Sequence, residues 1–421
     1  MLSLQKRKEK VVKIMTDEML NKFAQAVLRV GVNLQENQGL EIVCPVEKSR
    51  VAEILTETAY KMKAKIVRVR WECEAVDRLT YLNASKDTLT DIPKWLVDSK
   101  NYLVEKDFCY VAIAAENPSA YLGVPPEKIA AAAKARGKAL KKFSESVMAN
   151  GIRWCVVSVP TKEWAKTVFP ISENPEKELG DAIASTMRLN CEDPAKTWEK
   201  HIQTLNARAE FLNAHDFAAL HFSSGNGTDF TVGLCDGHKW LSAQEKAKDG
   251  INFVANMPTE EVFTAPHRLK ADGVVKSAMP LCYEGQIIDG FYLKFRQGKI
   301  VDFSAEKGYE ALKRLIETDK GTKRLGEVAL IGKNSPIAKS KILFYNTLFD
   351  ENASCHIALG KGYPTTVHGG ENLSKKELAQ KGLNDSIEHI DFMIGTEDTR
   401  VDGITKDGKA LPLFRKGDWI I

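Results

Sequence analysis

The second half of the chain contains a histidine and an aspartate at a spacing that suits metal coordination. His389 and Asp391 lie in the stretch EHIDFMIG, whose short apolar run is typical of a β-strand. Residues two apart on a strand project from the same face of the sheet. Both side chains can therefore reach one cation, although a His–Asp hydrogen bond on a solvated sheet face would have the same spacing.

Three further stretches add carboxylates and a second imidazole. Glu351 and His356 are five residues apart in FDENASCHIALG, although the Asp-Glu-Asn run could equally form a turn. Glu327 heads the apolar stretch GEVALIG, where a lone acid usually faces solvent. Glu260 and Glu261 lie between two prolines in MPTEEVFTAPH, a local rigidity that suits a fixed ligand but also an ordinary loop.

Together these stretches supply oxygen and nitrogen ligands without a thiolate. The candidate ligands are four carboxylates and two imidazoles, namely Glu261, Glu327, Glu351, His356, His389 and Asp391. The charge of four carboxylates would balance that of a pair of divalent cations. Such a mixed set suits Zn²⁺, Co²⁺ or Mn²⁺ rather than an all-oxygen Ca²⁺ site. The residue types therefore indicate a candidate metal site.

Other catalytic motifs are absent from the sequence. It contains no Walker-type phosphate loop, no Gly-x-Ser-x-Gly nucleophile elbow and no His-Glu-x-x-His zinc helix. Cys355 precedes His356, but neighbours on an extended chain point to opposite faces, so this thiol cannot use that imidazole as its base. The eight cysteines are scattered without a C-x-x-C pair, which favours reduced, structural thiols in a reducing compartment.

Composition narrows the class of protein and its location. The 421 residues are 43% hydrophobic and 28% charged, which is typical of a globular protein. A formal charge of +4 demands neither nucleic acid nor an anionic membrane as a partner. The longest apolar run, at residues 110–115, is far shorter than the ~20 residues that cross a bilayer. The basic N-terminus lacks the apolar core of a secretory signal, so we expect a cytoplasmic protein.

The elements that must position these ligands begin with a repeated strand–helix–strand pattern. An amphipathic helical stretch at 125–151 starts with Pro and ends with Gly. It alternates, like an earlier helix after Ser49, with β-rich runs at 39–45, 65–71, 109–115 and 153–159. This alternation predicts an α/β N-terminal domain with a mostly parallel sheet at residues 15–205, after a basic extension at 1–14.

The pattern changes after a helix-like stretch at residues 193–213. Two runs at 216–222 and 228–234 flank a Ser-Gly-Asn-Gly turn and predict an antiparallel hairpin. One helix is expected around 306–319, and further strand-like runs lie at 274–283, 286–305, 326–332 and 341–346. We therefore expect an α+β, largely antiparallel C-terminal domain at residues 206–421 that carries the metal ligands.

Four blocks of the sequence closely resemble the aminopeptidase T / aminopeptidase S family of bacterial metallo-aminopeptidases, also known as PepS or aminopeptidase II. They are NMPTEEVFTAPH, RLGEVALI, FYNTLFDENASCHIALGKGYP and HIDFMIG, in the family's order and spacing, and the resemblance extends from about Met15 to the C-terminus. It implies two metal ions held by the six candidate ligands, with Tyr363 nearby. It also implies a catalytic C-terminal domain, broad tolerance for the N-terminal residue of peptides, and association as homodimers.

Two features depart from the family. The basic stretch 1–14 has no counterpart in the resemblance, and Cys355 occupies a position where a small residue other than cysteine is expected. An exposed thiol there would make the enzyme sensitive to oxidation.

The resemblance suggests how such a site would cleave a peptide bond. A pair of cations lowers the pKa of a shared water and polarises the scissile carbonyl. Glu327 is our candidate for the bridging ligand, Tyr363 for a donor to the developing oxyanion, and Glu260 for the general base. Tyr363 could instead simply pack before Pro364. A free N-terminus would be recognised by a carboxylate, by one metal, or by walls that close the site, and such walls would come from the N-terminal domain or a dimer partner.

Two other functions use the same residues. The ions could be structural in a protein whose α/β domain binds a small ligand at its strand ends. The metal pair could also serve a non-peptidase amidohydrolase, which would be indifferent to a blocked α-amine. Turnover of aminoacyl substrates that is lost with a chelator would exclude the first of these alternatives.

Overall fold

The first half of the protein contains a parallel sheet of four strands, in the order β2-β1-β3-β4. The computed structural model describes residues 14–283 and 286–421, so the predicted extension at 1–14 lies outside the described residues except for Ile14. The strands are β1 (Gly39–Pro45), β2 (Ile66–Glu72), β3 (Cys109–Ile113) and β4 (Trp154–Val157). All their pairings are parallel, which confirms the predicted parallel sheet.

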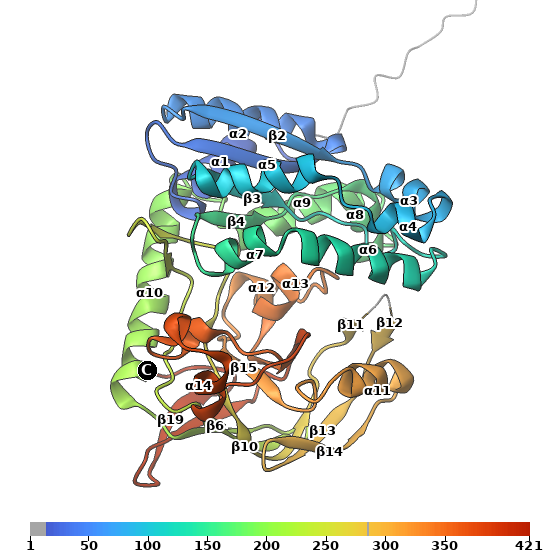
Figure 1. Cartoon of the computed structure of the whole chain (residues 1–421). Helices are drawn as coiled ribbons and strands as arrows, with labels where there is room; N and C mark the ends of the chain where they lie inside the picture. The colour runs from blue at the N-terminus through green and yellow to red at the C-terminus, as the bar shows by residue number, and fades with distance from the viewer. Residues whose placement is uncertain (1–13, 284–285) are drawn as a thin grey trace, which may run out of the picture.

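Helices pack around this sheet (Figure 1). They are α1 (Asp17–Ala26), α2 (Ser49–Lys61), α3 (Glu74–Asn83), α4 (Lys86–Thr90), α5 (Lys94–Glu105), α6 (Pro126–Ala139), α7 (Lys141–Met148), α8 (Lys162–Val168) and α9 (Pro175–Thr186). The buried face of α2 carries Val51, Ile54 and Leu55 at helical spacing. The prediction of a single helix at 125–151 is wrong. The backbone leaves helical geometry at Leu140, which separates α6 from α7.

A long helix, α10 (Pro194–His215), runs along one side of the molecule past both halves (Figure 1). The Asp193 carboxylate caps its first turn by accepting the N–H of Lys196 at 3.1 Å. Trp198, Ile202 and Leu205 are buried on the side that faces the rest of the protein. This element matches the helix predicted at 193–213.

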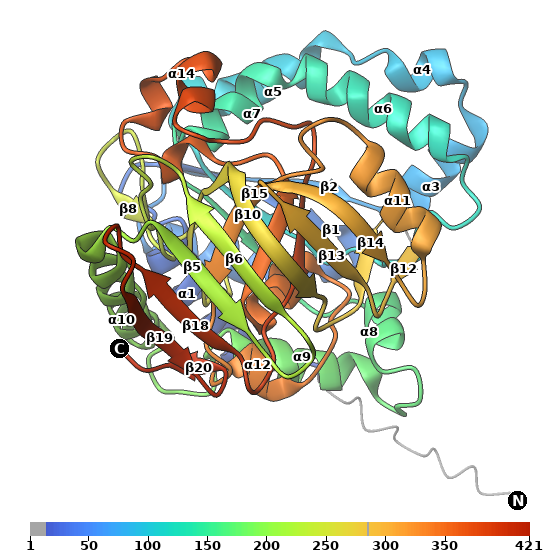
Figure 2. The same cartoon turned by 90° about the horizontal axis from the view of Figure 1, so that it is seen from below.

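The second half contains two larger antiparallel sheets. The four-stranded sheet lies between the parallel sheet and the eight-stranded sheet (Figures 1 and 2). Its order is β17 (His389–Met393), β16 (His356–Gly360), β15 (Leu325–Leu330) and β9 (Val262–Thr264). The order of the eight-stranded sheet is β14 (Lys299–Ser304), β13 (Tyr292–Arg296), β10 (Pro266–Lys276), β6 (Asp229–Leu234), β5 (Ala219–Ser223), β18 (Arg400–Ile404), β19 (Ala410–Arg415) and β20 (Asp418–Trp419).

Smaller elements complete this half. Two short strand pairs are β7 (Glu245–Lys246) with β8 (Asn252–Phe253), and β11 (Leu281–Tyr283) with β12 (Gln286–Ile288). The helices are α11 (Tyr309–Glu317), α12 (Pro336–Ser340), α13 (Thr347–Asp350) and α14 (Lys375–Gln380), with a 3-10 turn, η3, at Glu351–Ala353. The hairpin predicted at 216–234 is confirmed by the pairing of β5 with β6.

The strand predicted at residues 341–346 is wrong. The N–H groups of Phe344 and Asn346 donate to the Asp350 carboxylate at 2.7 and 3.0 Å. Tyr345 between them has a φ of 53°, in the left-handed region that no strand uses. The carboxylate of Asp350 therefore accepts the hydrogen bonds that a neighbouring strand would otherwise accept from this apolar segment.

One buried apolar cluster runs through both halves and contains residues from Leu20 to Phe414. The division into two separately folded domains near residue 205 therefore stays a prediction. No helix in the described part of the chain has the length and apolar character that a membrane span requires.

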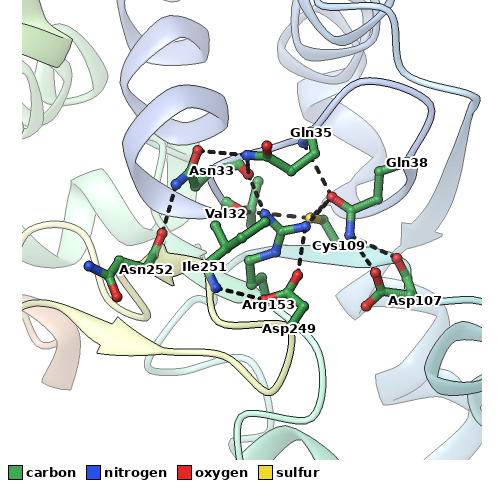
Figure 3. A network of polar contacts seen from close by, with 10 residues as sticks. All are labelled: Val32, Asn33, Gln35, Gln38, Asp107, Cys109, Arg153, Asp249, Ile251 and Asn252. Carbon is green, nitrogen blue, oxygen red and sulfur yellow. Dashed lines mark hydrogen bonds and ion pairs between the residues drawn. The ribbon is translucent and has the colours of Figure 1, made fainter.

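Polar contacts join the two halves around Arg153, whose side chain is 1% exposed (Figure 3). Its guanidinium donates to the carbonyl oxygen of Asn33 at 2.6 Å and to the amide oxygen of Gln38. It also forms an ion pair with Asp249, at 3.3 Å, on the turn between β7 and β8. One buried cation thus connects β4, the segment before β1 and the second half of the chain.

A second connection continues the parallel sheet into the second half. The N–H of Val156 in β4 donates to Ala255 at 2.7 Å, and the Val156 carbonyl accepts from Met257 at 3.0 Å. Further along, the indole N–H of Trp164 donates to the carbonyl of Phe344 at 2.6 Å. These bonds fix the chain shortly before Glu261 and shortly before Glu351, which are two of the candidate ligands.

We predict that Arg153→Met destabilises the whole fold. The substitution leaves buried acceptors without a donor and Asp249 without its cation, a loss we place at about 3 kcal/mol in the free energy of unfolding. Urea denaturation measures this change. The matched control is Arg136→Met on the exposed surface of α6, which should leave the unfolding midpoint in place. Equal stability of the two variants would contradict the bridging role of Arg153.

Candidate metal centre

The four-stranded sheet presents its candidate ligands on one face. Asp391 in β17 and Glu327 in β15 both lie opposite Ala358 of β16, so the three form one row across the sheet. His356 lies two residues from Ala358 on the same face, and His389 lies opposite Gly360. Small residues between the ligands leave room above this face for an ion.

A β-bulge at Gly326 decides which way Glu327 points. Leu325 lies opposite Leu359, but the next regular pair is Glu327 opposite Ala358, so β15 contains one extra residue. In a regular strand residues 325 and 327 would share a face, so Glu327 would point to the same side as Leu325. A Cβ at Gly326 would lie 2.2 Å from the Lys361 carbonyl oxygen, so glycine is required there. The bulge therefore turns Glu327 toward the other ligands.

The side chains form two overlapping groups of three, Glu261 with Glu327 and His356, and Glu327 with His389 and Asp391. The Nε2 atom of His356 lies 3.3 Å from Glu327, 3.5 Å from Glu261 and 3.8 Å from Asp391. The Nε2 atom of His389 lies 3.4 Å from Asp391 and 3.8 Å from Glu327. Glu327 belongs to both groups.

The orientation of His389 suits metal coordination. Its Nδ1 lies 2.7 Å from the carbonyl oxygen of Lys361, which can only accept, so the proton is on Nδ1. Nε2 is thereby left facing Asp391 and Glu327. Such a bond from the outer nitrogen to a carbonyl is the usual support of a metal-binding imidazole.

Burial and mutual repulsion perturb the acids of the cluster. Burial, and then the charge of Glu327, raise the pKa of Glu261 to about 8. Burial and the charges of Glu261 and Asp391 raise the pKa of Glu351 well above its usual range. A cation in the site would therefore stabilise the ionised form of both carboxyls.

The pKa values of the two imidazoles are raised as well, but by the neighbouring carboxylates and against the effect of burial. Burial alone would lower the pKa of His356, but the adjacent carboxylates of Glu327 and Asp391 raise it to about 10. His389 reaches about 10 as well, chiefly through Asp391, which overcomes the effect of burial. The cluster therefore attracts cations strongly and holds protons that a divalent metal would displace.

The donor set fits a divalent transition metal. Oδ1 of Asp391 is buried, and its nearest polar neighbours are the two imidazoles, with Nε2 of His389 at 3.4 Å and Nε2 of His356 at 3.8 Å. A cation between these groups would satisfy all three. The available donors are imidazole nitrogens and carboxylate oxygens, the ligands that Zn²⁺ and similar ions use.

A cavity of about 190 Å³ opens onto the cluster and includes two further predicted residues, Glu351 and Tyr363. The Tyr363 ring lies 4.7 Å from the His389 ring, and burial together with the carboxylates raises the pKa of the phenol. Met148, Asn150 and Trp154 of the first half form part of the cavity wall. The first half thus supplies walls of the site, as the sequence suggested.

Glu260 is not among the cavity-lining side chains of the described chain. Its carboxylate accepts a hydrogen bond from Arg188 at 2.6 Å and lies 3.5 Å from the imidazole of His201. Its predicted role as general base stays a prediction, and the pairing with a buried guanidinium does not favour proton transfer at the cluster.

Sequence reasoning missed the residues that hold the ligand-bearing segments. The amide oxygen of Asn352, which is 0% exposed, accepts the backbone N–H of Glu260 at 2.8 Å, and its NH₂ donates to Leu348 at 3.2 Å. This side chain therefore connects the segment of Glu261 to that of Glu351. The only signal was its place next to Glu351, where an asparagine is equally typical of a turn.

Cys355 behaves as a structural thiol. It is 2% exposed, and burial raises its pKa to about 12. Its Sγ accepts the N–H of Ile331 at 3.4 Å, on the side of the sheet away from His356. The condition for oxidation sensitivity, an exposed thiol, is not met. The eight cysteines all lie in the described part of the chain and form no disulfide.

Comparisons with known proteins agree with this site. A family model described as thermophilic metalloprotease (M29) matches residues 16–419. The chain is 42% identical to aminopeptidase 2 of Geobacillus stearothermophilus over 96% of this chain and 98% of the relative. It is 41% identical to aminopeptidase AmpS of Bacillus subtilis (strain 168), with the same coverage. The solved structure of wild-type AmpT from Thermus thermophilus superposes with a TM-score of 0.89 at 37% identity, covering 96% of this chain and 99% of that one.

These matches cover nearly the whole chain and are therefore not limited to a single motif. They confirm the predicted resemblance and the predicted class of enzyme, a metal-dependent aminopeptidase. The chain belongs to the M29 family of metalloproteases.

Proposed function

We propose that this enzyme releases N-terminal amino acids from peptides with two divalent cations held by Glu261, Glu327, Glu351, His356, His389 and Asp391. The observation that carries the proposal is the meeting of two imidazoles with several carboxylates on one buried sheet face. Bound cations would lower the pKa of a water and polarise the scissile carbonyl. Zinc or cobalt suits the donor set best, and manganese is a third candidate.

The protein's own residues would divide the remaining work. Glu327 reaches both imidazoles, the position that a shared ligand requires. Tyr363 lines the cavity beside His389, and a raised pKa keeps its phenol protonated. It can therefore donate a hydrogen bond to the oxygen on which charge develops. Lys361 and Asn352 hold ligand-bearing segments in place through backbone contacts.

The substrates would be peptides with a free N-terminus. The cavity beside the cluster is small, and the walls from both halves of the chain exclude the middle of a folded protein. Association as a homodimer and a cytoplasmic location complete the proposal, the first from the family resemblance and the second from the composition.

Removal of the metal should abolish activity. We expect a chelator to stop the hydrolysis of leucyl-p-nitroanilide and added Zn²⁺ or Co²⁺ to restore it. Glu327→Gln should match the chelated enzyme and purify with less metal, because the amide cannot replace the shared carboxylate. Elemental analysis and a thermal melt separate metal loss from unfolding. The control, Glu371→Gln on an exposed turn, should behave as wild type. Full turnover by Glu327→Gln would contradict the ligand assignment.

Loss of the Tyr363 hydroxyl should slow turnover without loss of metal. Tyr363→Phe keeps the ring against His389 and removes only the hydrogen-bond donor. We expect kcat to fall ~10²–10³-fold, the usual effect of one oxyanion donor, with KM and metal content close to wild type. Steady-state kinetics and elemental analysis measure these quantities. An unchanged kcat would leave Tyr363 a packing residue.

A further inference from the structure

The cavity beside the candidate metal centre contains one carboxylate that takes no part in the cluster. Glu245 of β7 lines this cavity. One carboxylate oxygen accepts a hydrogen bond from the side chain of Asn150 at 2.6 Å. No cationic side chain of the described residues forms an ion pair with it, although an acid in such surroundings normally has a positive partner. Its charge is therefore available to a ligand.

Glu245 lies outside the two groups of candidate ligands. The two cluster imidazoles pair with Glu261, Glu327 and Asp391 but not with Glu245. Burial raises the pKa of Glu245, and the hydrogen bond from Asn150 lowers it.

Apolar side chains form part of the wall of this cavity. Trp154, Leu241, Met148 and Phe263 line the same cavity. An apolar wall that ends in an unpaired carboxylate matches a side chain with an aliphatic stem and a cationic head. The volume of about 190 Å³ is below the ~300–1,000 Å³ of pockets that hold drug-sized ligands, so it suits one side chain.

We propose that this cavity receives the side chain of the substrate's N-terminal residue and that Glu245 favours lysine and arginine there. The inference rests on the proposed aminopeptidase function and names a specificity-determining residue for it. Asn150 positions the carboxylate, and the larger spaces beyond Glu351, of about 260 and 450 Å³, accommodate the rest of the peptide. Neutral residues can enter the cavity but leave the carboxylate without a partner.

The test compares arginine with citrulline, a neutral side chain of nearly the same shape. For wild-type enzyme we expect kcat/KM for arginyl-p-nitroanilide to exceed that for citrullyl-p-nitroanilide about tenfold to hundredfold, as for a hydrogen bond between charged groups. Glu245→Gln should bring this ratio close to one, with a much smaller change in kcat/KM for leucyl-p-nitroanilide. The amide oxygen of glutamine can still accept from Asn150, so the fold should persist, and a thermal melt checks it. Glu173→Gln, at an exposed position, is the matched control.

Two results would overturn the inference. One is an arginine-to-citrulline ratio that is the same in wild type and Glu245→Gln. The other is an equal loss for all three substrates, which would mean that Glu245 acts on a feature common to them. Hydrolysis of the leucyl substrate by wild type tests the aminopeptidase function independently, so failure of that function is distinguishable from failure of the inference.

Discussion

The candidate metal centre brings several ionisable groups together in the protein interior, where an unpaired charge costs the most free energy. The side chains of His356, Glu327 and Asp391 are only 1%, 7% and 10% exposed, and they touch one another on one sheet face. Unpaired charges in such a place cost several kcal/mol each, and like charges raise this cost. The arrangement is stable only when bound cations balance the negative charge of the carboxylates. This constraint explains why small residues, Ala358 and Gly360, separate the ligands, and why a bulge at Gly326 turns Glu327 into the row.

A cluster that repels itself must be held by its surroundings. Glu261 and Glu351 come from segments far apart in the sequence, and Asn352 bonds one to the other through the N–H of Glu260. On the opposite side of that segment Arg188 pairs with the Glu260 carboxylate and stacks on Trp198, 5.0 Å from its ring. An uncharged amide and a neutralised ion pair thus fix the backbone without adding net charge to the site.

Local patterns in the sequence predicted what depends on local geometry. The parallel sheet, the β5–β6 hairpin and the shared face of His389 and Asp391 all follow from alternation along short segments. The features that the sequence could not predict depend on contacts between segments far apart in the chain. The carboxylate of Asp350 turns residues 341–346 away from a strand, and the bulge at Gly326 is visible only in the register of β15 against β16. The roles of Arg188 and Glu245 depend on neighbours more than 70 residues away.

The parallel sheet also contributes directly to the geometry of the ligands. Val156 at its edge is hydrogen-bonded to residues 255–257, which lead into Glu261, and Trp164 is bonded to Phe344, which leads into Glu351. Buried hydrogen bonds of this kind move little, because breaking one leaves an unsatisfied polar group. Two ligand-bearing segments are thus fixed against a sheet that carries no ligand of its own. The first half of the chain therefore supports the metal centre as well as lining the substrate cavity. A substitution that loosened the parallel sheet would displace the ligands even though no ligand itself was substituted.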